Sequence, residues 1–191
     1  MIFIFTGCLA FVFFYIFDLN KIWFMKKGLN ICFAAGIVLL AASTAGVLLG
    51  NYQGFEVWLP LKYFFGALSA GSLFMVIYSL FFALPFAETY AEVKQGNSVV
   101  SNGIYALCRH PGVIWFFFFY LFLWLASGKT MLLLAGAIWT VMDIIHVYIE
   151  DRWFFPASLS GYDEYKKAVP FLIPNPASIK RCMALKQGGA R

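Results

Sequence analysis

Five long apolar stretches limit this chain to a helical fold that spans a membrane. They run from Ile2 to about Phe17, from about Leu29 to Gly50, from about Leu59 to Phe86, from about Gly112 to Ala126 and from about Met131 to Ile149. About 20 mostly apolar residues in a helix cross the hydrocarbon core of a bilayer. The pattern therefore predicts an all-α, polytopic bundle of about five transmembrane helices, of which the fourth is short. We expect the first stretch to be a retained helix, because no basic region precedes it.

The composition argues against a water-soluble protein. Hydrophobic residues make up 62% of the 191 residues and charged residues 12%, against about 45–50% and about 25% in soluble domains. These values disfavour a soluble enzyme, a disordered chain and a nucleic-acid-binding domain, so we expect no nucleic-acid partner. The four cysteines form no CxxC pair, and the two histidines are His110 and His146. We therefore predict no metal site.

The distribution of basic residues predicts the orientation of the bundle. With the N-terminus outside, 12 of the 14 Lys and Arg residues fall on the inner side. Basic residues accumulate on the cytoplasmic side of membrane proteins, which favours an N-out, C-in topology. The inner residues are Lys21, Lys26, Lys27, Lys94, Arg109, Arg152, Lys166, Lys167, Lys180, Arg181, Lys186 and Arg191, and the outer ones are Lys62 and Lys129.

A very short link joins the fourth and fifth stretches. Residues 127–130 read Ser-Gly-Lys-Thr, so the two stretches should form a tight antiparallel hairpin. Their inner ends would then lie side by side, with Arg109-His110-Pro111 next to Glu150-Asp151-Arg152. After this hairpin we expect a short cytoplasmic helix from Tyr162 to about Val169, followed by an extended tail.

Polar residues on the fifth stretch are candidates for function. Asp143, His146 and Glu150 follow an i, i+3, i+7 spacing that places them on one helical face. Ionisable residues in a membrane span are expensive and therefore need a reason. We favour a functional role for Glu150. For Asp143 and His146, a hydrogen bond to a neighbouring helix is an equally good explanation.

The inner end of the hairpin has the chemistry of a small-ligand site. Pro111 suits the first turn of a helix, which places Arg109 and His110 near a helix N-terminus, where anions bind. S-adenosylmethionine fits this set: Arg109 or the helix N–H groups would hold its carboxylate, and Glu150 or Asp151 its ribose or ammonium. NADPH is a rival, although its phosphates would require more Arg and Lys than the hairpin offers.

Two motifs resemble the isoprenylcysteine carboxyl methyltransferase and phospholipid methyltransferase superfamily. The run Gly103-x-Tyr105-x-x-x-Arg109-His110-Pro111 resembles its GxYxxxRHP signature. Glu150-Asp151 stands in place of its Glu-Glu pair, and Tyr162-x-x-Tyr165-x-x-x-Val169-Pro170 follows at the usual distance. The resemblance covers roughly residues 99–170. Trp115 stands where the family usually has Gly.

The resemblance implies an integral-membrane methyltransferase that uses S-adenosylmethionine and faces the cytoplasm. Its substrate would be lipophilic, such as a prenylated cysteine carboxylate or a membrane phospholipid. The implied cofactor residues are Tyr105, Arg109, His110, Pro111, Glu150, Asp151, Tyr162 and Tyr165. The candidate catalytic residues are Glu150, Arg152 and Arg109, and the candidate substrate-pocket residues are Asp143, His146 and Trp115.

We expect one domain over residues 1–191. Residues 1–86 would shape a lipid pocket, 87–170 would carry the cofactor loop, hairpin and acidic motif, and 171–191 would form a cytoplasmic tail. Two alternatives stay open. One is an NADPH-dependent reductase of a membrane lipid or sterol, with the Lys166/Lys167 or Lys180/Arg181 pair on the 2′-phosphate. The other is a non-catalytic membrane scaffold of the same fold.

Overall fold

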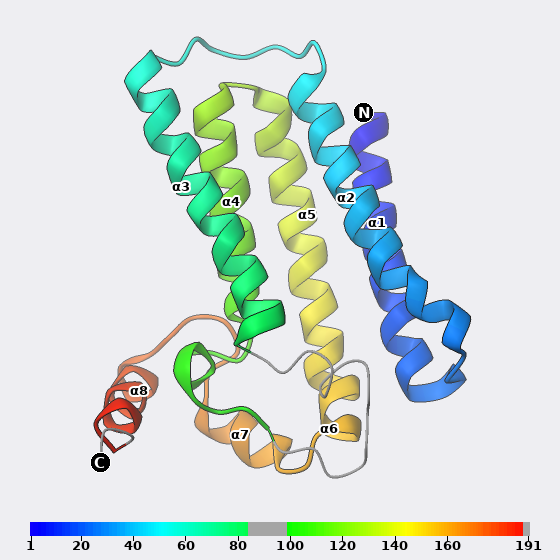
Figure 1. Ribbon diagram of the computed structural model, residues 1–191, viewed down its shortest axis with the longest axis vertical. Coiled ribbons are helices and arrows are strands. Elements are labelled where there is room, and N and C mark those ends of the chain that lie inside the picture. Colours follow the sequence, from blue (N-terminus) through cyan, green and yellow to red (C-terminus); the bar gives the residue numbers. More distant parts are fainter. Residues whose placement is uncertain (84–98, 189–191) are drawn as a thin grey trace.

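The computed structural model describes residues 1–83 and 99–188, and every regular element in this part of the chain is helical (Figure 1). The α-helices are α1 (Ile2–Leu19), α2 (Ile31–Leu49), α3 (Leu59–Ile77), α4 (Pro111–Ser127), α5 (Thr130–Ile149), α6 (Phe155–Ser158), α7 (Tyr162–Ala168) and α8 (Pro176–Gly188). Short 3₁₀ or π-helical turns cover Asn20–Phe24, Lys27–Asn30, Tyr78–Phe82, Gly103–Ala106 and Glu150–Phe154.

Four helical segments are long and apolar enough to cross a membrane. They are Ile2–Phe24, Lys27–Leu49, Leu59–Phe82 and Thr130–Ser158. The fourth apolar stretch forms α4, which is equally apolar but has only 17 residues. The all-helical prediction is therefore confirmed for the described residues. Residues 84–86 at the end of the third stretch, together with Lys94 and Arg191, lie outside them.

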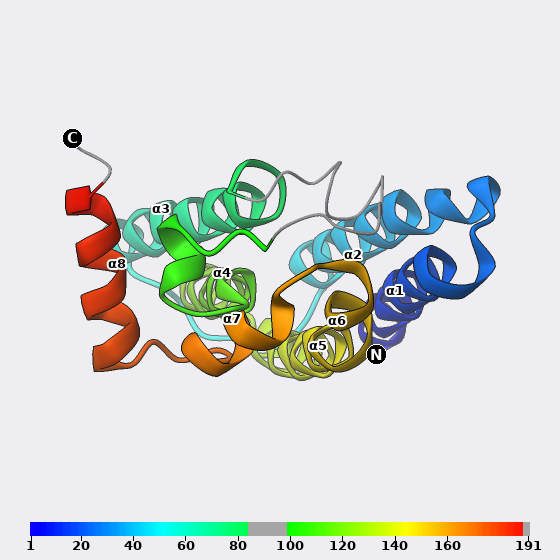
Figure 2. The same ribbon diagram turned by 90° about the horizontal axis from the view of Figure 1, so that it is seen from below.

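The long helices form an open arc. Seen from below, the order is α3, α4, α5, α1 and α2 (Figure 2). The tightest pairs are α3 with α4 and α1 with α2, and α5 joins them by packing on both α4 and α1. Consequently α2 and α3, although consecutive in the sequence, stand at the two ends of the arc. Among the described residues, the arc is open between these two helices, which are not one of the packed pairs.

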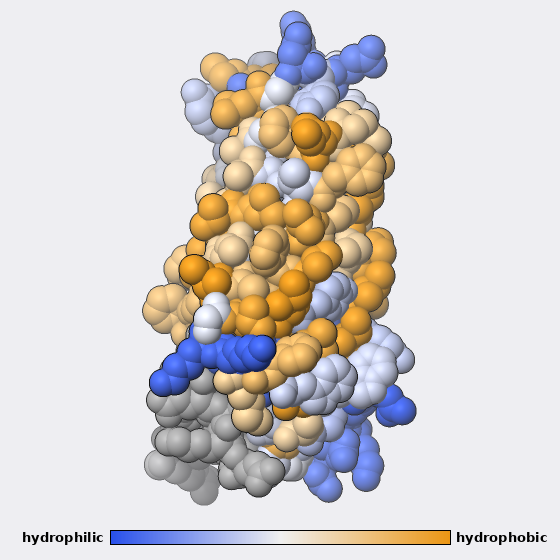
Figure 3. All heavy atoms as spheres, turned by 90° about the vertical axis from the view of Figure 1, so that its right-hand side faces the viewer, coloured by the Kyte–Doolittle hydropathy of each residue, from blue (hydrophilic) through white to orange (hydrophobic). Residues whose placement is uncertain are grey.

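The outer surface of the bundle suits a lipid environment. In Figure 3, a broad band of apolar residues covers the middle of the molecule, and hydrophilic residues gather at both ends. Exposed side chains of this kind include Phe5 on α1, Val38 on α2 and Phe74 on α3. A soluble protein rarely exposes a continuous apolar surface of such extent, so the band is the expected lipid-facing surface of an integral membrane protein.

The hairpin of α4 and α5 forms as predicted. Gly128 ends α4 in the left-handed conformation, with φ +70°, which glycine adopts at little cost. Its carbonyl accepts a hydrogen bond from the Phe55 N–H (N–O 3.0 Å), and the Lys129 ammonium donates to the Gly50 carbonyl (2.6 Å). The α2–α3 connection is thereby tied to the tip of the hairpin.

The C-terminal segment differs partly from expectation. Helix α7 occupies the predicted position, but residues 176–188 form α8 where an extended tail was expected. The reason is local: the Asn175 side-chain oxygen accepts a hydrogen bond from the Ser178 N–H (2.8 Å). Pro176 then takes the first helical turn, where its missing N–H is harmless.

Candidate functional site

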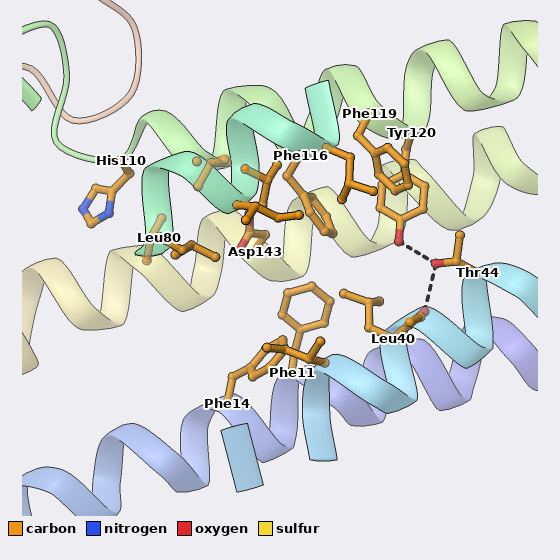
Figure 4. Close-up of a pocket in the computed structure, with 18 of the residues that line it drawn as sticks. Phe11, Phe14, Leu40, Thr44, Leu80, His110, Phe116, Phe119, Tyr120 and Asp143 are labelled. Carbon is orange, nitrogen blue, oxygen red and sulfur yellow. Dashed lines mark hydrogen bonds between the residues drawn. The ribbon is translucent and has the colours of Figure 1, made fainter. Parts of the chain in front are cut away.

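A cavity of about 560 Å³ lies within the arc, lined by side chains of α1 to α5 (Figure 4). Tyr105, Arg109, His110 and Glu150 line it at the end where the hairpin closes on the loop before α4. At the opposite end the hydroxyls of Thr44 and Tyr120 are hydrogen-bonded (O–O 2.7 Å). Between them the lining is almost entirely apolar, apart from Asp143.

The loop before α4 is held by buried tyrosines. Tyr105 donates its hydroxyl to the Ser79 carbonyl (2.9 Å), and Tyr165 donates its hydroxyl to the Tyr105 carbonyl (2.7 Å). Burial raises the pKa of both phenols above the ordinary value. Both groups therefore stay neutral and act as hydrogen-bond donors. Gly103, with φ +58°, begins the 3₁₀ turn that starts this loop.

The predicted proximity of Arg109 and Asp151 is confirmed. Arg109 Nε donates to Asp151 Oδ1 (2.7 Å) and Nη2 to Oδ2 (3.2 Å), while Nη1 donates to the carbonyls of Lys166 and Val169 (2.8 and 2.7 Å). Backbone bonds from Arg109 N to Pro170 O and from His110 N to Phe171 O run alongside. Arg109 therefore clamps the segment after α7 onto the loop before α4.

Asp151 is the hub of this clamp. Besides Arg109, the Tyr162 hydroxyl donates to Asp151 Oδ1 (2.7 Å), and the Lys166 ammonium lies 2.8 Å from Oδ2. Burial, followed by this carboxylate contact, raises the pKa of Tyr162. The contacts assign Asp151 a positioning role. A direct ligand contact by Asp151, expected from the sequence, remains a prediction.

His110 lies at the boundary between the clamp and the cavity. It precedes Pro111, the first residue of α4, and its Nε2 atom is 3.4 Å from Asp151 Oδ1. Phe155 and Phe171 pack against its ring. Burial lowers the pKa of His110, so the imidazole that lines the cavity is neutral at pH 7. Burial also raises the pKa of the neighbouring Cys108 thiol to about 11.

Asp143 and His146 of α5 and Glu150, the first residue after α5, do not share one role. Asp143 and Glu150 line the cavity. His146 is directed to α1 instead, where its Nε2 lies 2.6 Å from Asp18 Oδ2 and its ring meets the edge of Tyr15. This contact favours the interhelical explanation for His146 over a place in the substrate pocket.

Asp18 is not among the site residues predicted from the sequence, because it follows directly on the predicted end of the first apolar stretch. Helix α1 continues past that point and includes Asp18, which is only 5% exposed to solvent. The signal was a lone acidic residue beside a long apolar run. One ligand atom each of Asp18, His146 and Glu150 lies within 4.8 Å of the others. Since the His146–Asp18 distance is that of a hydrogen bond, we interpret this group as an interhelical ion pair.

Five other predicted site residues are not among the residues that line the cavity, and Pro111 is one of them. Trp115 is not among its lining residues and packs near Phe118, so its expected place in a substrate pocket stays a prediction. Tyr162 and Tyr165 belong to a buried aromatic cluster behind the loop rather than to the lining. Arg152 is exposed and borders a separate hollow of about 390 Å³ on the far side of Asp151.

Two further lining residues, Thr44 and Tyr120, were not recognised in the sequence. Tyr120 is the one hydroxyl of its apolar stretch and Thr44 has only Ser43 beside it, which is a weak signal in either case. Their hydrogen bond joins α2 to α4 across one end of the cavity.

No protein-family model, curated protein or solved structure matches this chain in the comparisons with known proteins. The resemblance to the methyltransferase superfamily therefore rests on the motif residues alone.

Proposed function

We propose that this protein is an integral-membrane methyltransferase that transfers a methyl group from S-adenosylmethionine to a lipophilic substrate. One observation carries the proposal. Tyr105, Arg109 and His110 of the first motif and Glu150 of the second line the same end of a cavity that is otherwise apolar. A polar end for a soluble cofactor and an apolar body for a lipid tail are what such a reaction needs.

The membrane topology is part of the proposal. In it, α4 crosses the bilayer as a fifth span, because it is apolar and packs on both α3 and α5, which are long enough to cross a membrane (Figure 1). The distribution of Lys and Arg supports an N-out, C-in orientation. The polar end of the cavity then faces the cytoplasm, where nucleotide cofactors are available.

The residues at the polar end fit the proposed cofactor. The buried Glu150 carboxylate would accept hydrogen bonds from the ribose hydroxyls or the ammonium group. The N-terminus of α4 and neutral His110 would hold the carboxylate end, and nearby rings such as Phe155 offer faces for a sulfonium. When bound, the cofactor supplies an electrophilic methyl group. The chain binds and aligns the two reactants and keeps out water.

The clamp gives Arg109 and Asp151 an indirect part in this function. Their contacts fix the loop that carries Tyr105 and His110 against the turn after α5 that carries Glu150. A further contact of Asp151 weighs against the alternative of an NADPH-dependent reductase. Lys166, one of the cations expected on a 2′-phosphate, is held by Asp151 at 2.8 Å.

The open side of the arc suits entry of a lipid. Residues of α2 and α3, including Ile37 and Leu73, form part of the lining, although these helices stand at opposite ends of the arc. A prenylated carboxylate or a phospholipid-like substrate would pass between them with its tail in the bilayer. Either substrate class agrees with an apolar lining of this kind.

Calorimetric titration of the purified chain with S-adenosylhomocysteine, with NADPH run in parallel, tests the proposal. We expect saturable binding of S-adenosylhomocysteine and a loss of at least tenfold in affinity in Glu150→Gln. Glu164→Gln, at an exposed carboxylate on α7, is the matched control and should bind normally. Binding of NADPH alone, or binding of neither cofactor by a folded sample, would overturn the proposal.

A further inference from the structure

Asp143 places a carboxyl group in the middle of the cavity, away from its polar end. Figure 4 shows it between His110 and the Tyr120–Thr44 pair. It makes no hydrogen bond to any residue within 1–83 and 99–188, the ranges described by the structure. The nearest basic group on its own helix is His146, one turn away, and that imidazole is engaged by Asp18 on α1.

A carboxylate at this depth is costly without a partner. A structural role would require a hydrogen bond to a neighbouring helix, such as the one that His146 makes, and Asp143 makes none within the described ranges. The carboxyl group is directed into an open space large enough for a ligand. The hydrogen-bond partner that Asp143 lacks among the described residues is therefore best supplied by a ligand in the cavity.

Aromatic rings surround the same part of the cavity. Figure 4 shows Phe116 of α4 on the side of Asp143 and Phe11 and Phe14 of α1 on the facing side, and the rings of Phe11 and Phe116 meet edge to face at 6.3 Å. A carboxylate combined with several aromatic rings is a chemistry that recognises ammonium groups. The rings favour a cation that is already partly desolvated, and the carboxylate neutralises it.

The lining of the cavity does not fit a ligand that carries a phosphate group next to its ammonium group. Arg109 is the one Lys or Arg among the described residues that line the cavity, and its guanidinium is bound to Asp151. Asp143 lies seven residues before Glu150 on the same helical run, which is roughly 10 Å along the axis. A phospholipid headgroup at Asp143 would thus leave its phosphate among apolar side chains.

We propose that the cavity binds a lipophilic amine that carries no phosphate, with its protonated nitrogen on Asp143 and its hydrocarbon chain along the apolar lining. This replaces the prenylated carboxylate and the phospholipid considered above with an amine as the substrate class of the proposed methyltransferase. It rests on the proposed function only in taking the amine as the methyl acceptor. The binding itself requires no cofactor.

The test compares three ligands of one chain length: dodecylamine, dodecanol and dodecanoate. Each is titrated into the full chain in nanodiscs of zwitterionic lipid at neutral pH, without cofactor, and empty nanodiscs supply the blank. We expect saturable binding of the amine at an affinity at least about tenfold above that of the alcohol. Asp143→Asn should remove this preference and leave the affinity for dodecanol unchanged.

Two variants keep the result interpretable. Asp143→Glu retains the charge and should retain the preference for the amine, and Asp163→Asn, at an exposed carboxylate on α7, should behave as the unaltered protein. Equal affinities for the amine and the alcohol, or an amine affinity that Asp143→Asn does not change, would overturn the inference. Binding of S-adenosylhomocysteine without amine binding overturns this inference alone. Amine binding without S-adenosylhomocysteine binding overturns the methyltransferase proposal alone.

Discussion

Arg109 and Asp151 form a bidentate ion pair with N–O distances of 2.7 and 3.2 Å, although they are 42 residues apart in the sequence. The side chains are 9% and 5% exposed. The pair joins the loop before α4 to the helical run after α5, and the segment after α7 is bound to the same guanidinium. The geometry of the polar end of the cavity therefore depends on one buried charge pair.

Asp151→Asn should be strongly destabilising. It removes the charge that Arg109 and Lys166 share, and breaking a buried pair by removing one partner costs about 3–5 kcal/mol. We expect a loss near the lower end of that range, because Lys166 is partly exposed. Unfolding by denaturant in detergent micelles measures the free energy. Asp163→Asn is the control, and a loss below about 1 kcal/mol for Asp151→Asn would contradict the hub role.

The contact between Asp18 and His146 should couple α1 to α5. A double-mutant cycle with Asp18→Asn and His146→Gln should give an interaction free energy of about 1–3 kcal/mol, as for residues that share one buried hydrogen bond. The single variants and the double variant are compared by unfolding under identical conditions. Additive effects would show that the 2.6 Å contact contributes nothing to stability.

Acidification should destabilise the fold through His110. Burial lowers its pKa below the unfolded value of about 6.5, so the unfolded chain binds the additional proton first as the pH falls. The corresponding stability is present above about pH 6.5 and is lost below it. Unfolding midpoints measured from neutral pH downward should fall in the native chain and fall less steeply in His110→Gln. Identical slopes in the two proteins would exclude His110 as the cause.

Two glycines with left-handed backbones should respond differently to alanine. Gly128 (φ +70°) and Gly161 (φ +77°) share the backbone conformation, in which alanine costs about 1 kcal/mol. A Cβ at Gly128 would also collide with the Phe55 carbonyl oxygen, whereas one at Gly161 meets nothing within 4 Å. Gly128→Ala should therefore cost at least about 1 kcal/mol more than Gly161→Ala in unfolding measurements. Equal losses would mean that the α2–α3 connection moves freely.

The parts of the site that the sequence predicted are those in which short-range rules apply. The short 127–130 link was enough to bring Arg109 next to Asp151, because a tight helical hairpin leaves its two free ends as neighbours. Helix α8 was not predicted, because a polar tail that contains prolines favours an extended chain. The capping signal of Asn175, Pro176 and Ser178 nevertheless starts a helix there.

The sequence by itself determined the helical class, the apolar spans and the pairing of the hairpin ends, since these follow from hydrophobic length and turn geometry. Only the tertiary structure decided which of Asp143, His146 and Glu150 line the cavity and which contacts α1. Asp143 and Glu150 line the cavity, while His146 binds an aspartate of the first helix. Helical periodicity places residues on a common face but does not say which neighbour covers each part of it. That assignment depends on the packing of α1 against α5, and this packing is established by contacts between residues that are far apart in the sequence.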